Sequence, residues 1–282
     1  MINLSALSED TAYLDRFIAI RDKKHLVTRR PLIAAHQLIE ERYEAYMQAV
    51  AQNTLCNLQS DAQALQIRRP LRACYDVATK PLRDLKQLIE DAQPRRLLKY
   101  CPMCGVTLPG TFDHYLPASK FPEFAVHPFN LVPCCGTCNS TKDDDWLSVT
   151  GKRQYLHAYS DQVPAQKIVF VTLHENPNLD GVGATFLLQR PVNLLDEMWE
   201  LIDSHFSRLK LLARYNELGN DEVAEILADC CTYIEAGGPD VRDFLRRRTE
   251  ERSRIYGQNH WVVVLMDAMA QHDNLDQWIQ AM

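Results

Sequence analysis

Two Cys-x-x-Cys pairs constrain the fold of this chain more than any other feature of its sequence. The first pair is Cys101 and Cys104, and the second is Cys135 and Cys138. Each pair can form a tight knuckle in which both thiolates face one metal ion, and four sulfur ligands are typical of a closed, tetrahedral zinc site. We therefore predict that these four cysteines hold a structural Zn²⁺. The alternative is a set of free, buried cysteines.

The other cysteines do not repeat this spacing. Cys134 lies beside the second pair and is the obvious competitor for its register, but only Cys135 has a cysteine three positions later. Free cysteine is often a small, buried packing residue. We expect that role for the remaining members of the set, which are Cys56, Cys74, Cys230 and Cys231.

Composition and charge indicate a globular protein. With 46% hydrophobic and 24% charged residues, the chain of 282 residues can fill two or three modules around a shared core. No apolar run reaches the length of a membrane span, and the N-terminus lacks the features of a signal peptide. We therefore expect a cytoplasmic protein with no membrane association, in which paired cysteines bind metal instead of forming disulfides. A net charge of −6 argues against binding to nucleic acid through overall charge, although a cleft needs only local positive charge.

Residues 1–96 are predicted to form an N-terminal helical region. From Pro31 to Val50, apolar residues recur every three to four positions, which indicates an amphipathic helix. Pro31 suits the first turn of such a helix, where its missing N–H carries no cost. A second helix is predicted from about Pro70 to Pro94.

The middle of the chain changes character. In residues 97–150 the helical periodicity disappears, and we expect short strands and turns followed by a short helix that opens near Gly136. Residues 151–190 are predicted to connect this module to the rest of the chain through a β-hairpin. Its strands would be Lys167–Leu173 and Gly183–Leu188, joined by a turn-rich linker, and the alternative is one strand plus a loop.

Residues 191–282 are predicted to form a C-terminal helical region. Its apolar stripes have helical spacing, and Gly219 and Gly237 are expected to separate successive helices. The predicted fold class is therefore mainly α, with a small α+β module inserted between two helical regions.

The segment that contains the cysteine pairs also carries a group of polar side chains. It reads DHYLPASKFPEF and then NLVPCCGTCNSTK, and its polar residues of interest are Asp113, His114, Asn130, Asn139 and Lys142. In identity and spacing this segment resembles the zinc-containing branch of the HNH endonucleases, over roughly residues 97–150. The resemblance implies a ββα-metal finger with a four-cysteine zinc site and an activity that hydrolyses phosphodiester bonds.

The resemblance also implies a role for each polar residue. His114 would be the general base, and Asp113 and Asn139 would hold a catalytic Mg²⁺ or Mn²⁺. Asn130 would tie the loop together and hold the histidine in place. In the family the last motif position is often His, and Asn139 at this position favours a hard divalent ion over a transition metal. Lys142 would contact phosphate or cap the C-terminus of its helix, two alternatives that the sequence leaves open.

The chemistry of these side chains agrees with those roles. Hydrolysis of a phosphodiester needs an activated water, a cation at the scissile phosphate and help for the leaving oxygen. A histidine accepts protons near neutral pH, and carboxylate and amide oxygens are ligands for hard cations. Because Asp113 and His114 are adjacent, a strand would direct them to opposite faces, so a bend near Pro117 would have to bring both to one cleft. The alternative is a non-catalytic, zinc-stabilised module that binds nucleic acid or protein.

Several further residues have weaker signals. Arg95, Arg96 and Lys99 adjoin the predicted finger, and we expect them to contact nucleic-acid phosphates together with Lys142. Other arginines cluster at Arg68–Arg69 and Arg246–Arg248. The second cluster is interleaved with acidic residues, as in a solvated helix face or a protein-binding surface.

Three polar residues near the motif have two interpretations each. Glu123 would bind a second metal or, more simply, form an ion pair in its loop. His157 and Asp161 would approach the cleft or, more simply, pack the finger onto the β-hairpin.

The motif also resembles the HNH subunit of Septu-type anti-phage defence systems, which pairs with an ATPase. That resemblance implies a nucleic-acid substrate, with DNA favoured and RNA as the alternative, and a protein partner such as an ATPase subunit. The acidic net charge fits an enzyme that such a partner recruits or activates.

Overall fold

The structure is a computed structural model, and it describes residues 3–7, 13–163, 165–176 and 181–282. The chain divides into two compact units, here called the N-terminal unit (Asn3–Gln162) and the C-terminal unit (Val163–Met282). The described residues are mainly helical, with two antiparallel pairs of strands. This confirms the predicted fold class at that coarse level. The finer, four-part division at residues 96, 150 and 190 stays a prediction.

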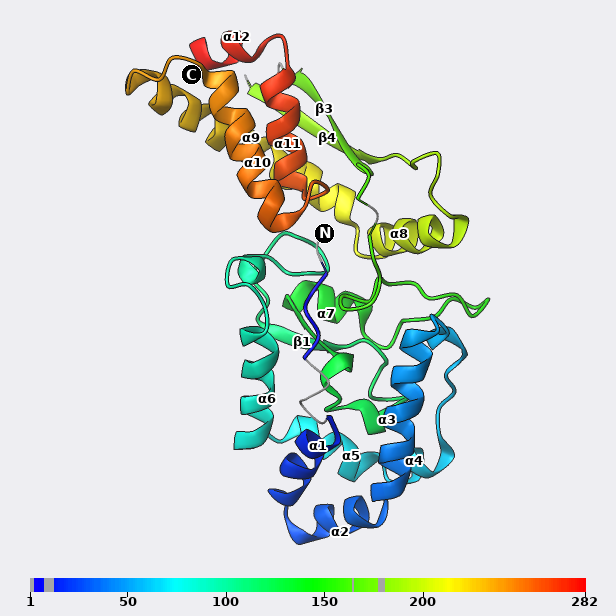
Figure 1. Ribbon diagram of the computed structural model, residues 1–282. Helices are drawn as coiled ribbons and strands as arrows, with labels where there is room; N and C mark the ends of the chain where they lie inside the picture. The colour runs from blue at the N-terminus through cyan, green and yellow to red at the C-terminus, as the bar shows by residue number, and fades with distance from the viewer. Residues whose placement is uncertain (1–2, 8–12, 164, 177–180) are drawn as a thin grey trace. The chain divides into compact units, whose positions relative to one another are not determined.

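The N-terminal unit begins with helices and ends with the segment that carries the motif (Figure 1). Its α-helices are α1 (Tyr13–Asp22), α2 (Leu26–Ala34), α3 (His36–Ala51), α4 (Ala62–Gln66), α5 (Arg68–Asp76), α6 (Lys80–Asp91) and α7 (Gly136–Lys142). Four 3₁₀ turns accompany them: η1 (Leu55–Asn57), η2 (Leu97–Lys99), η3 (Pro122–Phe124) and η4 (Pro128–Asn130).

Each of the two helices predicted in this region is in fact a pair. The helix expected from Pro31 is wrong at its start, because Pro31 lies inside α2 and the chain bends at Ala35 before α3. Leu32 of α2 and Ile39 of α3 are both buried, so the apolar stripe continues across this bend and periodicity alone did not reveal the break. The helix expected from Pro70 divides into α5 and α6. Thr79 is the N-cap of α6, and its hydroxyl accepts a hydrogen bond from the Leu82 N–H.

Strands β1 (Thr111–His114) and β2 (Leu131–Cys134) form an antiparallel pair, and α7 follows β2 after a single residue. Phe112 pairs with Pro133, and His114 pairs with Leu131. That single residue is Cys135, whose sulfur caps α7 by accepting a hydrogen bond from the Cys138 N–H. The short helix predicted near Gly136 is therefore confirmed, and it begins at the second cysteine pair.

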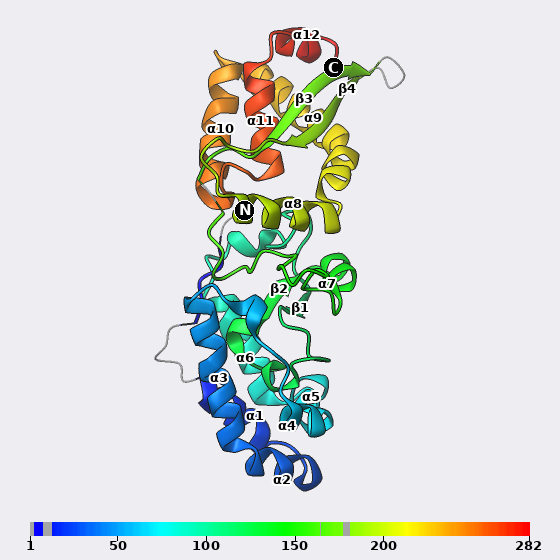
Figure 2. The same cartoon turned by 90° about the vertical axis from the view of Figure 1, so that its right-hand side faces the viewer.

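The motif segment is attached to the helices through an aromatic core. Tyr43 and Tyr46 of α3 contact the His127 ring edge-on, with centroid distances of 4.3 and 4.8 Å. Tyr46 also packs against Phe124, and its hydroxyl lies 3.2 Å from Nε2 of His157. Burying a large apolar side chain stabilises a fold by about 1.5–3 kcal/mol, so this cluster fixes the motif segment on the α-helices of the same unit. Figure 2 shows β1, β2 and α7 among these helices.

The C-terminal unit is a β-hairpin with helices packed on it. Its elements are β3 (Val169–Asn176), β4 (Gly181–Leu188), α8 (Asp196–Arg208), α9 (Leu211–Glu235), α10 (Val241–Tyr256), α11 (Trp261–Gln271) and α12 (Leu275–Gln280). The predicted hairpin is confirmed, with Val169 opposite Leu188, while residues 177–180 of its linker lie outside the described residues. Helix α9 packs on β4, and α11 packs on β3.

Gly219 does not end a helix as predicted, since it lies within α9. A Cβ atom at this position would approach the Phe186 ring to 3.0 Å and the Ala184 side chain to 3.1 Å. The glycine is therefore needed for close approach of α9 to β4, and not for chain reversal. Gly237 has a φ of +84° just beyond the C-cap of α9, which is the predicted role of a helix-ending glycine.

None of the described helices is both long enough and apolar enough to cross a membrane. The apolar run from Trp261 to Met266 lies in α11, where these residues are buried.

Candidate functional site

The four paired cysteines form one buried cluster. Their sulfur atoms all lie within 4.8 Å of one another, and Cys104 Sγ is 3.9 Å from Cys135 Sγ. Four sulfurs at about 2.3 Å from a tetrahedral zinc ion are about 3.8 Å apart, whereas a disulfide needs about 2.05 Å. None of the four cysteines is in a disulfide, and the spacing of their sulfur atoms matches that of a metal site. The cluster can therefore hold an ion such as zinc.

The local backbone and electrostatics suit thiolate ligands. Gly105 has a φ of +68°, so the turn after the first pair needs a residue without a Cβ atom. The Cys135 N–H donates a hydrogen bond to Cys101 Sγ at 3.3 Å. Hydrogen bonds led by the one from Cys101 lower the pKa of the Cys104 thiol to about 7 and lower the pKa of Cys135 much further. Hydrogen bonds led by the one with Cys104 raise the pKa of Cys101, so the bonds within the cluster favour the thiolate at some cysteines and the thiol at others.

Cys134 is not a member of the cluster. It is buried, and its sulfur lies 3.4 Å from the hydroxyl oxygen of Thr111 on the paired strand. The preference for Cys135 over Cys134 is therefore confirmed by the positions of the sulfur atoms.

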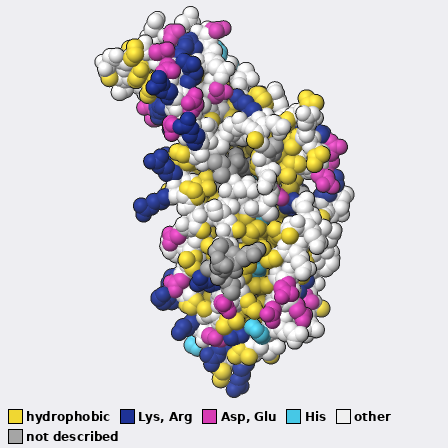
Figure 3. Space-filling view, in the orientation of Figure 1, with side chains coloured by type: hydrophobic (Ala, Val, Ile, Leu, Met, Phe, Trp, Pro, Cys, Tyr) yellow, Lys and Arg dark blue, Asp and Glu magenta, His cyan; other side chains and the backbone are white. Residues whose placement is uncertain are grey.

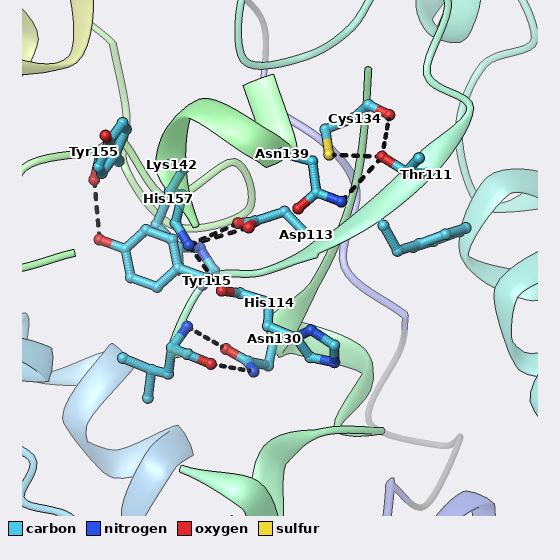
Figure 4. Close-up of polar contacts among 12 residues, drawn as sticks. Thr111, Asp113, His114, Tyr115, Asn130, Cys134, Asn139, Lys142, Tyr155 and His157 are labelled. Carbon is cyan, nitrogen blue, oxygen red and sulfur yellow. Dashed lines mark hydrogen bonds and ion pairs between the residues drawn. The ribbon is translucent and has the colours of Figure 1, made fainter. Parts of the chain in front are cut away.

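A second polar group lies beside the cluster, at the end of β1. Asp113 is buried, and both of its carboxylate oxygens lie near the Lys142 amine, at 3.1 and 3.0 Å. Lys142 is also buried and donates a hydrogen bond to the backbone oxygen of His114 at 2.8 Å. Burial raises the pKa of Asp113 above its ordinary value, although Lys142 acts in the opposite direction. Figure 4 shows the Asp113 carboxylate directed at the Lys142 amine.

His114 is half-buried and held in one orientation. Its Nε2 lies 2.9 Å from the Ala125 backbone oxygen, which is only an acceptor, so Nε2 carries the proton and Nδ1 keeps a free lone pair. The Tyr75 ring of α5 contacts the imidazole edge-on, with centroids 4.4 Å apart. Burial lowers the pKa of His114 to about 4, so the ring is neutral at neutral pH.

Asn130 ties together the loop between the strands. It is fully buried, and its Oδ1 accepts a hydrogen bond from the Leu116 N–H at 2.7 Å. Its Nδ2 donates to the backbone oxygens of Leu116 and Phe124 at 3.1 and 3.2 Å. These bonds join the segment that follows His114 to the segment that precedes Ala125, and so they hold the backbone oxygen that accepts the imidazole proton.

Asn139 directly follows the last cysteine of the cluster. Its Nδ2 donates a hydrogen bond to the Thr111 hydroxyl at 3.3 Å, and its Oδ1 has no hydrogen-bond partner among the described residues. In Figure 4 the Asn139 side chain lies beside the Asp113 carboxylate.

Asp113, His114 and Asn139 all line one cavity of about 350 Å³, here called the His114 cavity. Although Asp113 and His114 are adjacent on β1, both line this cavity; a bend near Pro117 as the cause stays a prediction. Helix α5 contributes Arg72, Tyr75 and Asp76 to the wall, and the chain after α7 contributes Asp143 and Asp144. The α5 residues could not be assigned to the site from sequence, because α5 lies far from the motif along the chain and only packing brings it there. Asp143 and Asp144 directly follow Lys142, so their position beside the motif was a signal that could have been used.

The other predicted residues lie elsewhere. Arg95, Arg96 and Lys99 are exposed and are absent from the described residues that line the His114 cavity, so their contact with nucleic acid stays a prediction. A phosphate contact by Lys142 would require its amine to leave Asp113.

Glu123 takes the simpler of its two interpretations, an ion pair, although its partner lies on α3 and not in the loop. Packing of the finger onto the hairpin through His157 and Asp161 stays a prediction. Glu123 pairs with Arg42 at 2.8 Å, and Asp161 pairs with Arg153 at 2.8 Å. His157 is buried against the Phe129 ring, with centroids 4.9 Å apart, so it packs in the core.

Comparison with known proteins gives one partial likeness. No family model matches the chain, and no solved structure matches it. Protein ea31 of Escherichia phage lambda is 27% identical over 136 residues, which is 48% of this chain and 46% of that protein. The chain therefore spans less than half the length of this relative, and the likeness assigns it neither a family nor an activity.

Proposed function

We propose that this chain is a metal-dependent endonuclease of the HNH type, in which β1, β2 and α7 form a zinc-stabilised ββα-metal finger. The observation that carries the proposal is the joint position of Asp113, His114 and Asn139 on one cavity beside the four-cysteine cluster. The substrate is nucleic acid, with DNA favoured over RNA, and the reaction is hydrolysis of a phosphodiester bond.

In this proposal His114 is the general base. The hydrogen bond from Nε2 to the Ala125 oxygen leaves Nδ1 as the proton acceptor, and a pKa of about 4 keeps the ring neutral and ready to take a proton from water. So low a pKa makes the ring a weak base when the cavity holds no substrate. A phosphodiester anion bound beside the imidazole would raise that pKa towards neutrality and strengthen the base.

Asp113 and Asn139 are the residues that would hold Mg²⁺ or Mn²⁺. They fit a hard cation, because Asn139 Oδ1 has no partner among the described residues and the Asp113 carboxylate has acceptor sites beyond the two directed at Lys142. When bound, such an ion neutralises charge on the phosphate and stabilises the leaving oxygen.

Two further residues position this group. Lys142 holds the Asp113 carboxylate and the His114 backbone oxygen, and Asn130 holds the loop that carries Ala125. The zinc cluster adds a third constraint, since Asn139 follows Cys138 within the first turns of α7. Folding around the zinc ion would therefore position a ligand of the catalytic cation.

We further propose that the enzyme acts in an anti-phage defence complex with a protein partner, such as an ATPase subunit. The support is the acidic net charge of −6, which disfavours recruitment to nucleic acid through overall charge and leaves that role to a partner.

The test is cleavage of DNA and RNA substrates in Mg²⁺ or Mn²⁺ by the wild type and by His114→Ala. We expect the wild type to cut and His114→Ala to be slower by about 10²–10⁴-fold, because general-base catalysis contributes a factor of that size. A matched control is His174→Ala, an exposed histidine on β3 of the other unit, which should cut like the wild type.

Equal rates for the wild type and His114→Ala would exclude the proposed mechanism. A wild type that binds nucleic acid but never cuts it, with or without its partner, would make the chain a binding module instead.

A further inference from the structure

Helix α5 presents three arginines to solvent on one side of the N-terminal unit. Arg68, Arg69 and Arg72 are all exposed, and all three line a second open cavity of about 570 Å³, here called the α5 groove. Within the described residues, Arg68 and Arg69 form no ion pair. Arg72 has a loose, exposed pair with Asp76 at 3.8 Å, which is a weak interaction in water.

The α5 groove adjoins the His114 cavity. Arg72, Asp76 and Ser119 line both spaces. Arg72 therefore stands at the junction, and the positive groups of α5 continue from the proposed active site along the protein surface.

The two spaces differ in charge. Asp76, Asp113, Asp143 and Asp144 line the His114 cavity and outnumber Arg72, its one lining arginine. The α5 groove has three arginines and one aspartate. A phosphodiester backbone is repelled by the carboxylates unless a cation is bound among them, and it is attracted by the arginines.

We infer that the α5 groove binds the backbone of a nucleic-acid strand. The same strand continues into the His114 cavity, where one of its phosphodiester bonds is cut. This inference rests on the proposed function and adds the path of the substrate. Arg68, Arg69 and Arg72 act as positioning residues: they contact phosphates outside the reacting group and carry no sequence preference. Arg68 and Arg72 are one helical turn apart, about 6 Å along the helix axis, so they can hold successive parts of an extended strand.

The arginines of α10 do not fit this role. Arg246 and Arg247 pair with Asp243, Arg248 pairs with Asp229, and Arg252 pairs with Glu222. Figure 3 shows Lys and Arg side chains interleaved with Asp and Glu in the region of α10. Their charges are compensated within the protein, whereas those of Arg68 and Arg69 are not.

The experiment measures binding separately from cutting. Full-length, zinc-loaded His114→Ala protein is titrated with fluorescent single- and double-stranded DNA and RNA oligonucleotides in Mg²⁺, between about 50 and 200 mM KCl, values of the order at which phosphate contacts dominate affinity. The test variant adds alanine at three positions: Arg68, Arg69 and Arg72. The matched control removes three exposed charges elsewhere in the same unit: Lys23, Arg30 and Arg83.

We expect the test variant to bind at least about tenfold more weakly than its parent. The slope of log K against log salt should fall by about 2 to 3, since each lost phosphate contact removes about 0.7–0.9. The control should keep both the affinity and the slope. A lysine variant at the same three positions should recover most of the binding, because phosphates respond to the charge itself.

A third variant tests the rival surface, with alanine at Arg95, Arg96 and Lys99. If the loss falls on this variant, or equally on the matched control, the α5 groove is not the path of the strand. If the parent binds none of the oligonucleotides, the inference is overturned as well.

Binding is read without cleavage, so the two proposals fail separately. A wild type that never cuts but loses affinity when α5 is changed would refute the nuclease and keep the groove. In the cutting enzyme, alanine at Arg68 and Arg69 alone should raise KM and leave kcat nearly unchanged, as expected for residues that hold the substrate equally well before and during reaction.

Discussion

The cysteine cluster and the His114 cavity lie next to each other and are built in opposite ways. The cluster is closed: four buried sulfurs come from two short segments and face one another. The cavity is open, with walls from β1, α5, the loop after β1, α7 and the residues that follow α7. A closed set of sulfurs suits an ion that stabilises the fold, whereas an open set of oxygen and nitrogen groups leaves room for a substrate. If the two sites are separable, changes in one should leave the other intact.

The largest effect is expected for the cluster. Cys138→Ser should lose the metal and unfold the finger, because structural zinc contributes about 10–16 kcal/mol to small domains of this kind. The measurement is zinc content per protein together with thermal unfolding. The matched control is Cys134→Ser, a buried neighbour outside the cluster, which should retain zinc. Zinc retained in Cys138→Ser and lost in Cys134→Ser would show that the ligand set is wrong.

The next effect concerns the buried ion pair that supports the cavity. Lys142→Met should lower the free energy of unfolding by about 3–5 kcal/mol, because it leaves the buried Asp113 carboxylate without its partner. Urea unfolding of the zinc-loaded protein, without added Mg²⁺, measures this. The double variant with Asp113→Asn should recover part of the loss, since it removes the unpaired charge. A loss below about 1 kcal/mol in the single variant would mean that the pair does not support the fold.

A third prediction concerns the two packing histidines, His127 and His157. Burial lowers the pKa values of His127 and His157 to about 3, while an unfolded histidine titrates near 6.5. In both rings Nδ1 already accepts a backbone N–H, from Phe129 and Tyr159, so a second proton has no place. Below pH of about 6.5 the unfolded chain therefore binds protons that the folded chain does not.

Stability should accordingly be full above about pH 6.5 and fall as the pH drops towards 3, by about 1.4 kcal/mol per pH unit for each histidine. Urea unfolding between these pH values, compared for the wild type and His157→Gln, measures the contribution. Because both proteins lose zinc ligands to acid alike, the difference between them isolates the histidine. An identical pH slope in the two proteins would contradict the assignment.

The smallest effect is expected at the residue where the two sites join. Asn139→Ala should retain zinc and unfold like the wild type, because its side chain makes one exposed hydrogen bond, to Thr111. It should need about ten times more Mg²⁺ for half-maximal cleavage, as loss of one weak oxygen ligand costs about 1.4 kcal/mol. Ser140→Ala, the exposed neighbour on α7, is the control. If Asn139→Ala also lost zinc, the two sites would not be separable at this position.

The sequence by itself determined the parts of this protein that are close together along the chain. The cysteine ligands are set by i and i+3 spacing, the short helix begins where the second pair ends, and Asn139 follows Cys138 directly. Local spacing limits what the backbone can bring together, so such features are readable before the fold is known. The mainly helical class was readable for the same reason, because an amphipathic stripe reflects only its own helix.

Only the tertiary structure decided which distant residues meet. The break between α2 and α3 is hidden in the sequence because the apolar spacing continues across it. Gly219 lies within α9, where β4 packs closely against it, and the sequence alone does not distinguish this role from a helix end. Tyr75 and Arg72 reach His114 from α5 only through packing of the helices on the motif segment. Lys142 meets Asp113 instead of solvent because α7 packs on β1 within the motif segment. Such contacts depend on the burial of many side chains from distant parts of the chain, so a short stretch of sequence does not determine them.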